Sequence, residues 1–85
     1  DHLECELLLL KVEVSGVSAR AVIECVRINH ATMLDESDNT RMIQLAGTSA
    51  EVDAFVGEIG KIARILELVR SGVAAMARGK SSSTN

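Results

Sequence analysis

An alternation of apolar and polar positions near the start of the chain predicts a β-strand over residues 6–14, ELLLLKVEV. Successive side chains of a strand point to opposite faces of a sheet, so every second residue shares a face. One face is apolar throughout: Leu8, Leu10, Val12 and Val14. Leu7 and Leu9 begin the other face, which continues with Lys11 and Glu13. A strand that is apolar on both faces at its start is typical of a central strand.

Helical spacing dominates residues 48–60. Apolar side chains recur there at i, i+3, i+4 and i+7, which places them on one stripe of an amphipathic helix: Val52, Phe55, Val56 and Ile59. Thr48 and Glu51 have the spacing of a capping box, in which each side chain accepts a hydrogen bond from a backbone N–H at the helix start. Gly47 allows the chain to turn sharply before this helix.

Another helix and two strands are predicted before this segment. The helix follows the first strand, is capped by Ser15 or Ser18, and has a buried stripe that includes three residues: Val22, Cys25 and Val26. Residues 31–36 and 40–46 then have the pattern of two short strands. An Asp-Asn dipeptide lies between them and suits a two-residue hairpin turn, because Asn tolerates a positive φ.

Side-chain alternation also assigns faces to the later strands. We expect Leu34 to face the same side of the sheet as Ile43 and Leu45. The last clear strand covers residues 63–70, and its helix-covered side is expected to carry two leucines, Leu66 and Leu68. The opposite side is expected to carry Ile65, Glu67 and Val69. Residues 73–77 fit either a short strand or a helical turn.

The predicted order of elements is βαββαβ. For this order, un-knotted connections and right-handed crossovers favour a ferredoxin-like (ACT-like) sandwich, an α+β fold with four antiparallel strands and two helices on one face of the sheet. An 85-residue chain is expected to form one domain. We expect residues 1–5 to be the end of a linker, residues 6–79 to form the domain, and residues 80–85 to be a mobile polar tail.

A ferredoxin-like sandwich leaves the second face of its sheet without a helix. The sequence makes that face apolar in part, and an apolar sheet face of this size is rarely left in water. We therefore expect it to contact a partner, either a second copy of the chain or another protein. The predicted partner or dimer surface consists of Leu7, Leu9, Met42, Gln44, Ile65, Glu67, Val69 and Arg70. Glu67 either pairs with Lys11 on the neighbouring strand or contacts the partner together with Arg70.

Composition and charge exclude two classes of partner. The net charge is −3 and the chain contains one aromatic residue, Phe55. Binding to nucleic acid requires a basic face, and binding to single strands usually requires stacking rings, so no nucleic-acid partner is expected. The apolar run at residues 7–10 is far shorter than a membrane span, so no membrane partner is expected.

The chemistry of catalytic or metal sites is also missing from the sequence. No metal-finger spacing connects the soft ligands, which are His2, Cys5, Cys25 and His30. Two cysteines without a CxxC pair favour a reduced, cytoplasmic chain over a disulfide scaffold. No Ser or Cys lies beside an evident base. An acylphosphatase-like hydrolase would need an arginine in the loop after the first strand, where the sequence is Ser-Gly-Val-Ser. We therefore predict no metal site, no cofactor and no catalytic residue.

Three segments carry a resemblance to a known family: ELLLLKV, QLAGTSAEVDAF and RILELVRSGVAAMARG. Together they resemble the C-terminal domain of the small, regulatory subunit of acetolactate synthase, over residues 4–79. The matching positions include Gly47, Thr48, Asp53, Ala54, Phe55, Glu67, Arg70, Ser71, Gly72, Arg78 and Gly79. The three motifs occur in the family's order and at its spacing.

The resemblance implies a non-catalytic role in the bacterial cytoplasm. Subunits of this family bind the thiamine-diphosphate-dependent large catalytic subunit, raise its activity, and confer feedback inhibition by valine or other branched-chain amino acids. The effector site of the family belongs to an N-terminal ACT domain outside this sequence, so we expect this chain not to sense valine by itself. The alternative is a free-standing ACT-like domain that binds a small amino acid directly. Both the large subunit and a second copy of the chain fit the uncovered sheet face.

Overall fold

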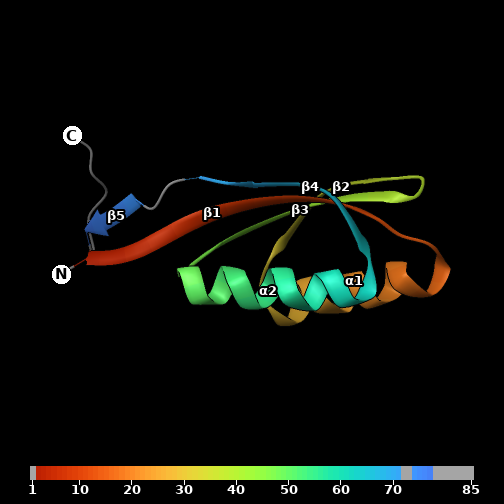
Figure 1. Ribbon diagram of the computed structural model, residues 1–85, viewed down its shortest axis with the longest axis horizontal. Helices are drawn as coiled ribbons and strands as arrows, with labels where there is room; N and C mark the ends of the chain where they lie inside the picture. The colour runs from red at the N-terminus through yellow and green to blue at the C-terminus, as the bar shows by residue number, and fades with distance from the viewer. Residues whose placement is uncertain (1, 72–73, 78–85) are drawn as a thin grey trace.

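The computed structural model describes residues 2–71 and 74–77. These residues form, in chain order, β1 (His2–Glu13), α1 (Gly16–Ile28), β2 (Thr32–Ser37), β3 (Thr40–Gly47), α2 (Ser49–Ile62), β4 (Arg64–Arg70) and β5 (Ala74–Ala77). Both helices cover the same face of the sheet (Figure 1). The predicted ferredoxin-like arrangement of two helices on a four-stranded antiparallel sheet is therefore confirmed.

The sheet has the strand order β2-β3-β1-β4, with β1 paired to β3 on one side and β4 on the other. The central position predicted for the first strand is thus confirmed. This strand is also longer than expected, because residues 2–5, predicted as the end of a linker, belong to β1 and pair with β5. Of the two forms open for residues 73–77, Ala74–Ala77 is a strand. The predicted tail, residues 80–85, lies outside the described residues.

The capping box at the start of α2 forms as predicted. The backbone N–H of Glu51 donates to Thr48 Oγ1 at 3.1 Å, and the backbone N–H of Thr48 donates to Glu51 Oε1 at 2.9 Å. A Cβ atom at Gly47 would lie only 2.7 Å from Glu51 Oε1, so a larger residue there would displace the carboxylate of the capping box. At the start of α1, Ser15 is the cap, and its backbone N–H donates to Ser18 Oγ at 2.8 Å.

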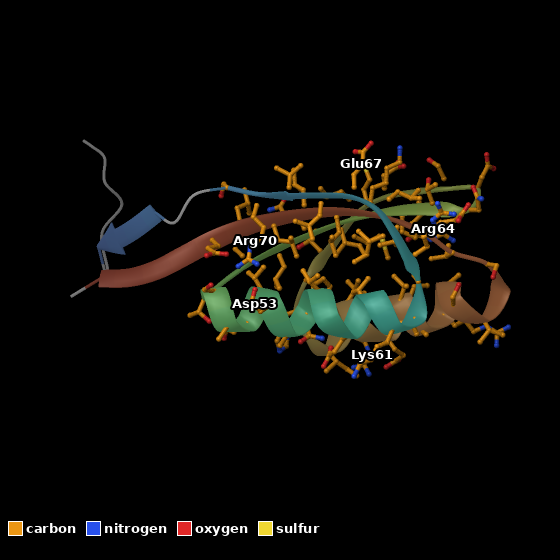
Figure 2. All side chains as sticks on the ribbon, viewed as in Figure 1. Asp53, Lys61, Arg64, Glu67 and Arg70 are labelled. Carbon is orange, nitrogen blue, oxygen red and sulfur yellow. The ribbon has the colours of Figure 1, made fainter. Side chains whose placement is uncertain are left out.

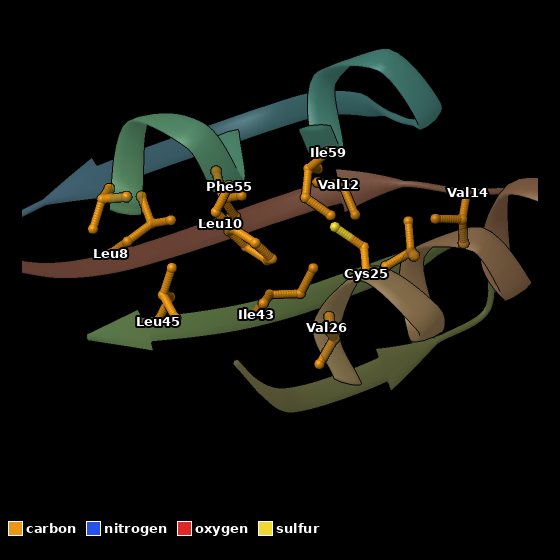
Figure 3. Close-up of a cluster of buried hydrophobic side chains, with 12 residues drawn as sticks. Leu8, Leu10, Val12, Val14, Cys25, Val26, Ile43, Leu45, Phe55 and Ile59 are labelled. Atoms are coloured by element: carbon orange, nitrogen blue, oxygen red, sulfur yellow. The ribbon is translucent and has the colours of Figure 1, made fainter. Parts of the chain in front are cut away.

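The core lies between the sheet and the two helices (Figure 3). Its side chains are Leu8, Leu10, Val12, Val14, Val22, Cys25, Val26, Ile43, Leu45, Val52, Phe55 and Ile59. Phe55 is the single aromatic residue of the chain, and its side chain is fully buried. Among the residues whose burial the structure describes, no polar or charged side chain is buried, so the core depends on aliphatic packing.

Both edge strands contain an extra residue that changes which side chains face the core. In β2, Met33 lies opposite Ile43 and Asp35 lies opposite Met42, which leaves Leu34 between them without a partner position. A bulge of this kind reverses the alternation beyond it. Met33 packs against the core and Leu34 is 47% exposed, so the prediction that Leu34 faces the same side as Ile43 was wrong.

The same irregularity in β4 moves Ile65 to the helix side of the sheet. Val12 lies opposite Ile65 and Lys11 lies opposite Glu67, so Leu66 is the extra residue. Because Val12 is fully buried, its partner Ile65 is on the core side, where it packs against the core cluster. The prediction that Ile65 belongs to the uncovered face was therefore wrong. Leu68 lies opposite the buried Leu10 and so faces the helix side, as predicted.

Candidate docking face

The surface of the sheet that points away from the helices is called the open face. Residues directly opposite each other in an antiparallel pair share a face, so the strand register assigns its members. Leu9 lies opposite both Gln44 and Val69, and Lys11 lies opposite Met42 and Glu67. Figure 2 shows Glu67 pointing away from the helices. The predicted surface residues that share the open face are therefore Leu7, Leu9, Met42, Gln44, Glu67 and Val69.

The open face is divided into an apolar half and a polar half. The apolar half contains Leu7 opposite Ala46, and Leu9 opposite Val69. Leu7 is 40% exposed and Val69 is 57% exposed, and both are neighbours of Leu9 on this face, so the three side chains form one contiguous apolar group. The polar half begins at Lys11 and continues with charged residues on either side of it: Glu13, Asp35, Arg64 and Glu67. The apolar half therefore offers surface to a partner, and the polar half borders it.

Lys11 and Glu67 occupy opposite positions on neighbouring strands, as the sequence suggested. Within residues 2–71, however, the ion pairs are formed by Arg27, Arg41 and Arg70 and do not include Lys11. The carboxylate of Glu67 makes no hydrogen bond to any of these described residues. Glu67 is thus exposed at the border of the apolar half, and its carboxylate has no hydrogen-bond partner among the side chains that the structure describes.

Arg70, predicted to be part of the open face, lies on the other side of the sheet. It is opposite Leu8, which is fully buried, and Figure 2 shows its side chain between the sheet and α2. Its Nε donates to Glu6 Oε1 at 2.9 Å and its Nη1 donates to Asp53 Oδ1 at 2.6 Å. The hydrogen bond to Glu6, followed by that to Asp53, raises the pKa of Arg70. The prediction that Arg70 contacts a partner from the open face was therefore wrong.

Glu6, Asp53 and Arg70 form what is called the Arg70 cluster, which links β1, α2 and β4. Each of its members comes from a different one of the three segments that carry the family resemblance. Next to the cluster, the backbone N–H of Ser71 donates to the carbonyl of Leu7 at 2.9 Å, and the N–H of Leu7 donates to Ser71 Oγ at 3.2 Å. These contacts fix the backbone beneath the apolar half of the open face.

A small polar group at the edge of the core involves Cys25. Its thiol donates to Glu58 Oε1 at 3.3 Å, and Asn29 Nδ2 donates to the same oxygen at 3.0 Å. Burial, together with the hydrogen bond to Glu58 and its charge, raises the pKa of the Cys25 thiol to about 11. Since only the thiolate is a good nucleophile, Cys25 is protonated and unreactive at neutral pH.

A cavity of about 440 Å³ lies at the end of α1. It is lined by Ile28, Asn29, His30, Leu45, Ala46, Glu51 and Ala54. A small amino acid would need a carboxylate for its ammonium group and a cationic partner for its carboxylate. Glu51 is the acidic residue of this lining, and it already accepts the hydrogen bond of the helix cap. The lining contains no Lys or Arg, so this cavity does not favour an amino-acid site.

The structure offers neither a group of metal ligands nor a membrane-spanning helix in the residues that it describes. In the part of the chain that it describes, no three His, Cys, Asp or Glu side chains gather where they could hold a metal ion. None of the helices in that part combines the length and apolar character needed to cross a membrane.

Comparison with known proteins places these features in a family. Residues 5–79 match the family model described as the small subunit of acetolactate synthase. The chain is 37% identical over 78 residues to the acetolactate synthase isozyme 3 small subunit of Escherichia coli, covering 92% of this chain and 48% of that relative. It is 34% identical over 80 residues to the acetolactate synthase small subunit of Haemophilus influenzae, covering 94% of this chain and 49% of that relative.

A solved structure agrees with the sequence relatives. The crystal structure of the acetolactate synthase small subunit from Thermotoga maritima matches with a TM-score of 0.80 at 25% identity, over 94% of this chain and 48% of that one. The chain thus spans about half the length of the relatives it matches. On the family match and these relatives, the chain belongs to the acetolactate synthase small-subunit family and corresponds to the C-terminal domain of that subunit.

Proposed function

We propose that this domain is a non-catalytic regulatory module that binds the large catalytic subunit of acetolactate synthase through the apolar half of its open face. Through this contact it supports activation of the thiamine-diphosphate-dependent enzyme and its feedback inhibition by branched-chain amino acids such as valine. Membership of a small-subunit family supports a catalytic subunit as the partner. The observation that carries the proposal is the exposure of Leu7 and Val69 on a sheet face without helices.

The layout of the open face suits a protein interface. Interfaces commonly have an apolar centre that excludes water and a polar rim that gives orientation. Leu7, Leu9 and Val69 supply the apolar centre. Gln44 and Glu67 lie at its border and supply hydrogen-bonding groups. Removing apolar surface from water contributes roughly 25 cal/mol per Å², so covering the apolar half with a partner favours binding.

Binding of the catalytic subunit to surface charge variants tests this proposal. Leu9→Asp and Val69→Asp introduce a carboxylate into the apolar half, and we expect each to weaken binding by tenfold or more, because an unpaired charge would be removed from water. Val17→Asp is the matched control, since Val17 is 86% exposed on α1, which lies on the other side of the sheet. Circular dichroism shows whether each variant is folded. Unchanged affinity for a folded Leu9→Asp variant would contradict docking through this face.

The rate of the catalytic subunit tests the regulatory part separately. The parent domain is expected to raise the rate of acetolactate formation at saturating concentration, and Leu9→Asp is expected to leave it near the basal value. If the domain binds the catalytic subunit without changing its rate, the docking surface is supported and the regulatory role is contradicted. Calorimetry with valine and the isolated domain is expected to show no heat of binding, since the family resemblance assigns the effector site to an N-terminal ACT domain.

A further inference from the structure

The last three residues of β3 have a free outer edge beside the end of α1. β2 begins at Thr32, which lies opposite Gln44, so residues 45–47 pair with β1 on one side and with no described strand on the other. The chain leaves that edge at His30, where φ is 59° and the backbone N–H donates to the carbonyl of Arg27 at 3.2 Å. Residues 45–47 and the cavity at the end of α1 are together called the notch.

The backbone of Ala46 presents its N–H and C=O to this free edge. In an antiparallel sheet both groups of one residue point to the same neighbouring strand, and successive residues alternate. Leu7 bonds away from β3, because its carbonyl accepts from the N–H of Ser71 at 2.9 Å. Leu8 and its partner Leu45 therefore bond to each other. Ala46 follows Leu45, so its N–H and C=O point away from β1, where no described strand meets them.

The cavity of about 440 Å³ lies directly beside this edge, since Ala46 forms part of its lining. Three apolar side chains of the lining are Ile28, Leu45 and Ala54, and Ile28 is 63% exposed. Successive residues of a strand that pairs with Ala46 would point to opposite faces of the sheet. One would point toward Leu45 and the cavity, and the next toward the open face, where Ala46 lies opposite Leu7. A single added strand thus reaches both the cavity and the apolar half.

The charges at the notch favour a basic occupant. Glu51 lines the cavity, and Oε1 of its carboxylate accepts the hydrogen bond of the helix cap while Oε2 has no hydrogen-bond partner in the described part of the chain. Glu58 lies close by, since its Oε1 accepts from Asn29 of the lining at 3.0 Å. The ion pairs among the described residues include neither acid, and the lining has no Lys or Arg. A cation supplied by a partner would therefore be attracted to this site.

We propose that an extended segment of the catalytic subunit pairs with Ala46 as an added strand, places an aliphatic side chain in the cavity, and brings a Lys or Arg to Glu51. Addition of a strand to a free sheet edge is a common mode of peptide recognition, in which the backbone gives affinity and a side-chain pocket gives specificity. The choice of partner rests on the proposed function, because the notch adjoins the apolar half of the open face at Ala46 and Leu7. One partner is thus expected to cover both.

Hydrogen exchange of single amides tests the strand pairing. The Ala46 amide of the domain bound to the intact catalytic subunit is expected to exchange at least about tenfold more slowly than in the free domain, because it gains a hydrogen bond. The amide of Leu45 already bonds to β1 and is the internal reference. A small molecule in the cavity would leave the Ala46 amide unprotected. Protection of Ala46 in the free domain that rises with its own concentration would assign the edge to a second copy and overturn the proposal.

Two variants of the notch test the cavity and its charge. Ala54→Leu fills part of the cavity from the exposed side of α2 and is expected to weaken binding of the catalytic subunit about fivefold or more. Glu51→Gln keeps an oxygen for the capping box but removes the charge, so binding is expected to weaken about threefold or more at low salt and less at high salt.

Asp38→Asn is the matched control, since it removes the same charge at the hairpin turn, at the other end of β3, and Asn tolerates the positive φ of 46° there. It is expected to bind as the parent does. Melting temperatures show that each variant is folded.

The outcomes separate this proposal from docking through the open face. An unprotected Ala46 amide in a complex that Leu9→Asp abolishes would retain docking and overturn the notch. A protected Ala46 amide, with unchanged binding by Leu9→Asp, would support the notch and contradict docking through the apolar half. Parent-like affinity of folded Ala54→Leu and Glu51→Gln would also overturn the proposal. A parent domain that does not bind the catalytic subunit would contradict both.

Discussion

Arg70 lies on the same side of the sheet as Leu68, two residues before it, and its partners come from two other elements. Its planar guanidinium has several fixed donors, so one side chain can bind two carboxylates from different elements. The carboxylate of Glu6 is 12% exposed and that of Asp53 is 64% exposed. The contact to Glu6 is therefore the better shielded from water, and we assign it the larger share of the stabilisation from this cluster.

The strand pattern indicates the side on which Arg70 lies but not its partners. Alternation from Leu68 puts Arg70 on the helix side of the sheet, so the prediction that Arg70 shares a face with Glu67 and Val69 departed from the pattern itself. The register, which sets Arg70 opposite the buried Leu8, agrees with this side, and the fold brings Glu6 and Asp53 next to it. The available signal for its partners was the presence of these two acids in the other two motif segments.

The Cys25 thiol gives a prediction about pH. Its pKa in the folded protein is about 11, above the ordinary value of 9.0, because burial and Glu58 disfavour the thiolate. Between these values the unfolded chain loses a proton that the folded chain keeps, so stability present below pH 9 is lost as the pH rises toward 11. The deprotonation of Cys25 lowers the free energy of unfolding by at most about 1.4 kcal/mol for each pH unit in this range. Urea unfolding at pH 8 and pH 10.5 is expected to show a steeper loss for the parent than for Cys25→Ala. Equal losses in the two proteins would contradict the assignment.

At the scale of elements, the sequence predicted helices and strands best where a single repeating pattern of apolar residues determines the element. The stripe through Val52, Phe55 and Ile59 predicts α2 and its buried side, because helix geometry repeats over several turns. The alternation of β1 predicts both its faces, because the pattern continues over a long strand, and pairing with β3 and β4 keeps that strand extended.

The extra residues in β2 and β4 could not be predicted in this way. A single inserted residue shifts the faces of all residues beyond it, and an alternating pattern contains no mark of the insertion point. In β4 each of the neighbours Ile65, Leu66 and Leu68 is apolar, so either assignment of faces satisfies the pattern. The register is decided by pairing with β1, where Val12 takes Ile65 into the core.

The cap of α2 supplies a prediction at this scale. Thr48→Ala removes the oxygen that accepts the hydrogen bond of Glu51 N–H, and we expect a loss of about 1 kcal/mol in the free energy of unfolding. Thermal or urea unfolding measures this value. Val17→Ala, at a highly exposed position of α1, is the control and is expected to change stability by less than about 0.5 kcal/mol. A loss for Thr48→Ala no larger than that of the control would show that the capping box does not contribute.

At the scale of the whole molecule, the fold separates stability from interaction. The described core lies entirely on the helix side, where the buried side chains of β1, β3 and both helices meet. The open face lies on the other side of the sheet from that core, so its side chains are free to serve contacts with other chains. This division follows from the ferredoxin-like order of elements, which was predictable from the sequence. The pairing of residues 2–5 with residues 74–77 was not predictable, because these two segments pair only with each other.

Amide hydrogen exchange tests how far the core supports the long strand β1. Residues 8–13 lie between β3 and β4 and under the helices, so their amides are expected to exchange only through large openings of the fold. Amides of residues 2–5 and of β5 depend on the pairing of these two segments alone and are expected to exchange at least about tenfold faster. Equal protection along β1 would show that residues 2–5 are part of the cooperative core.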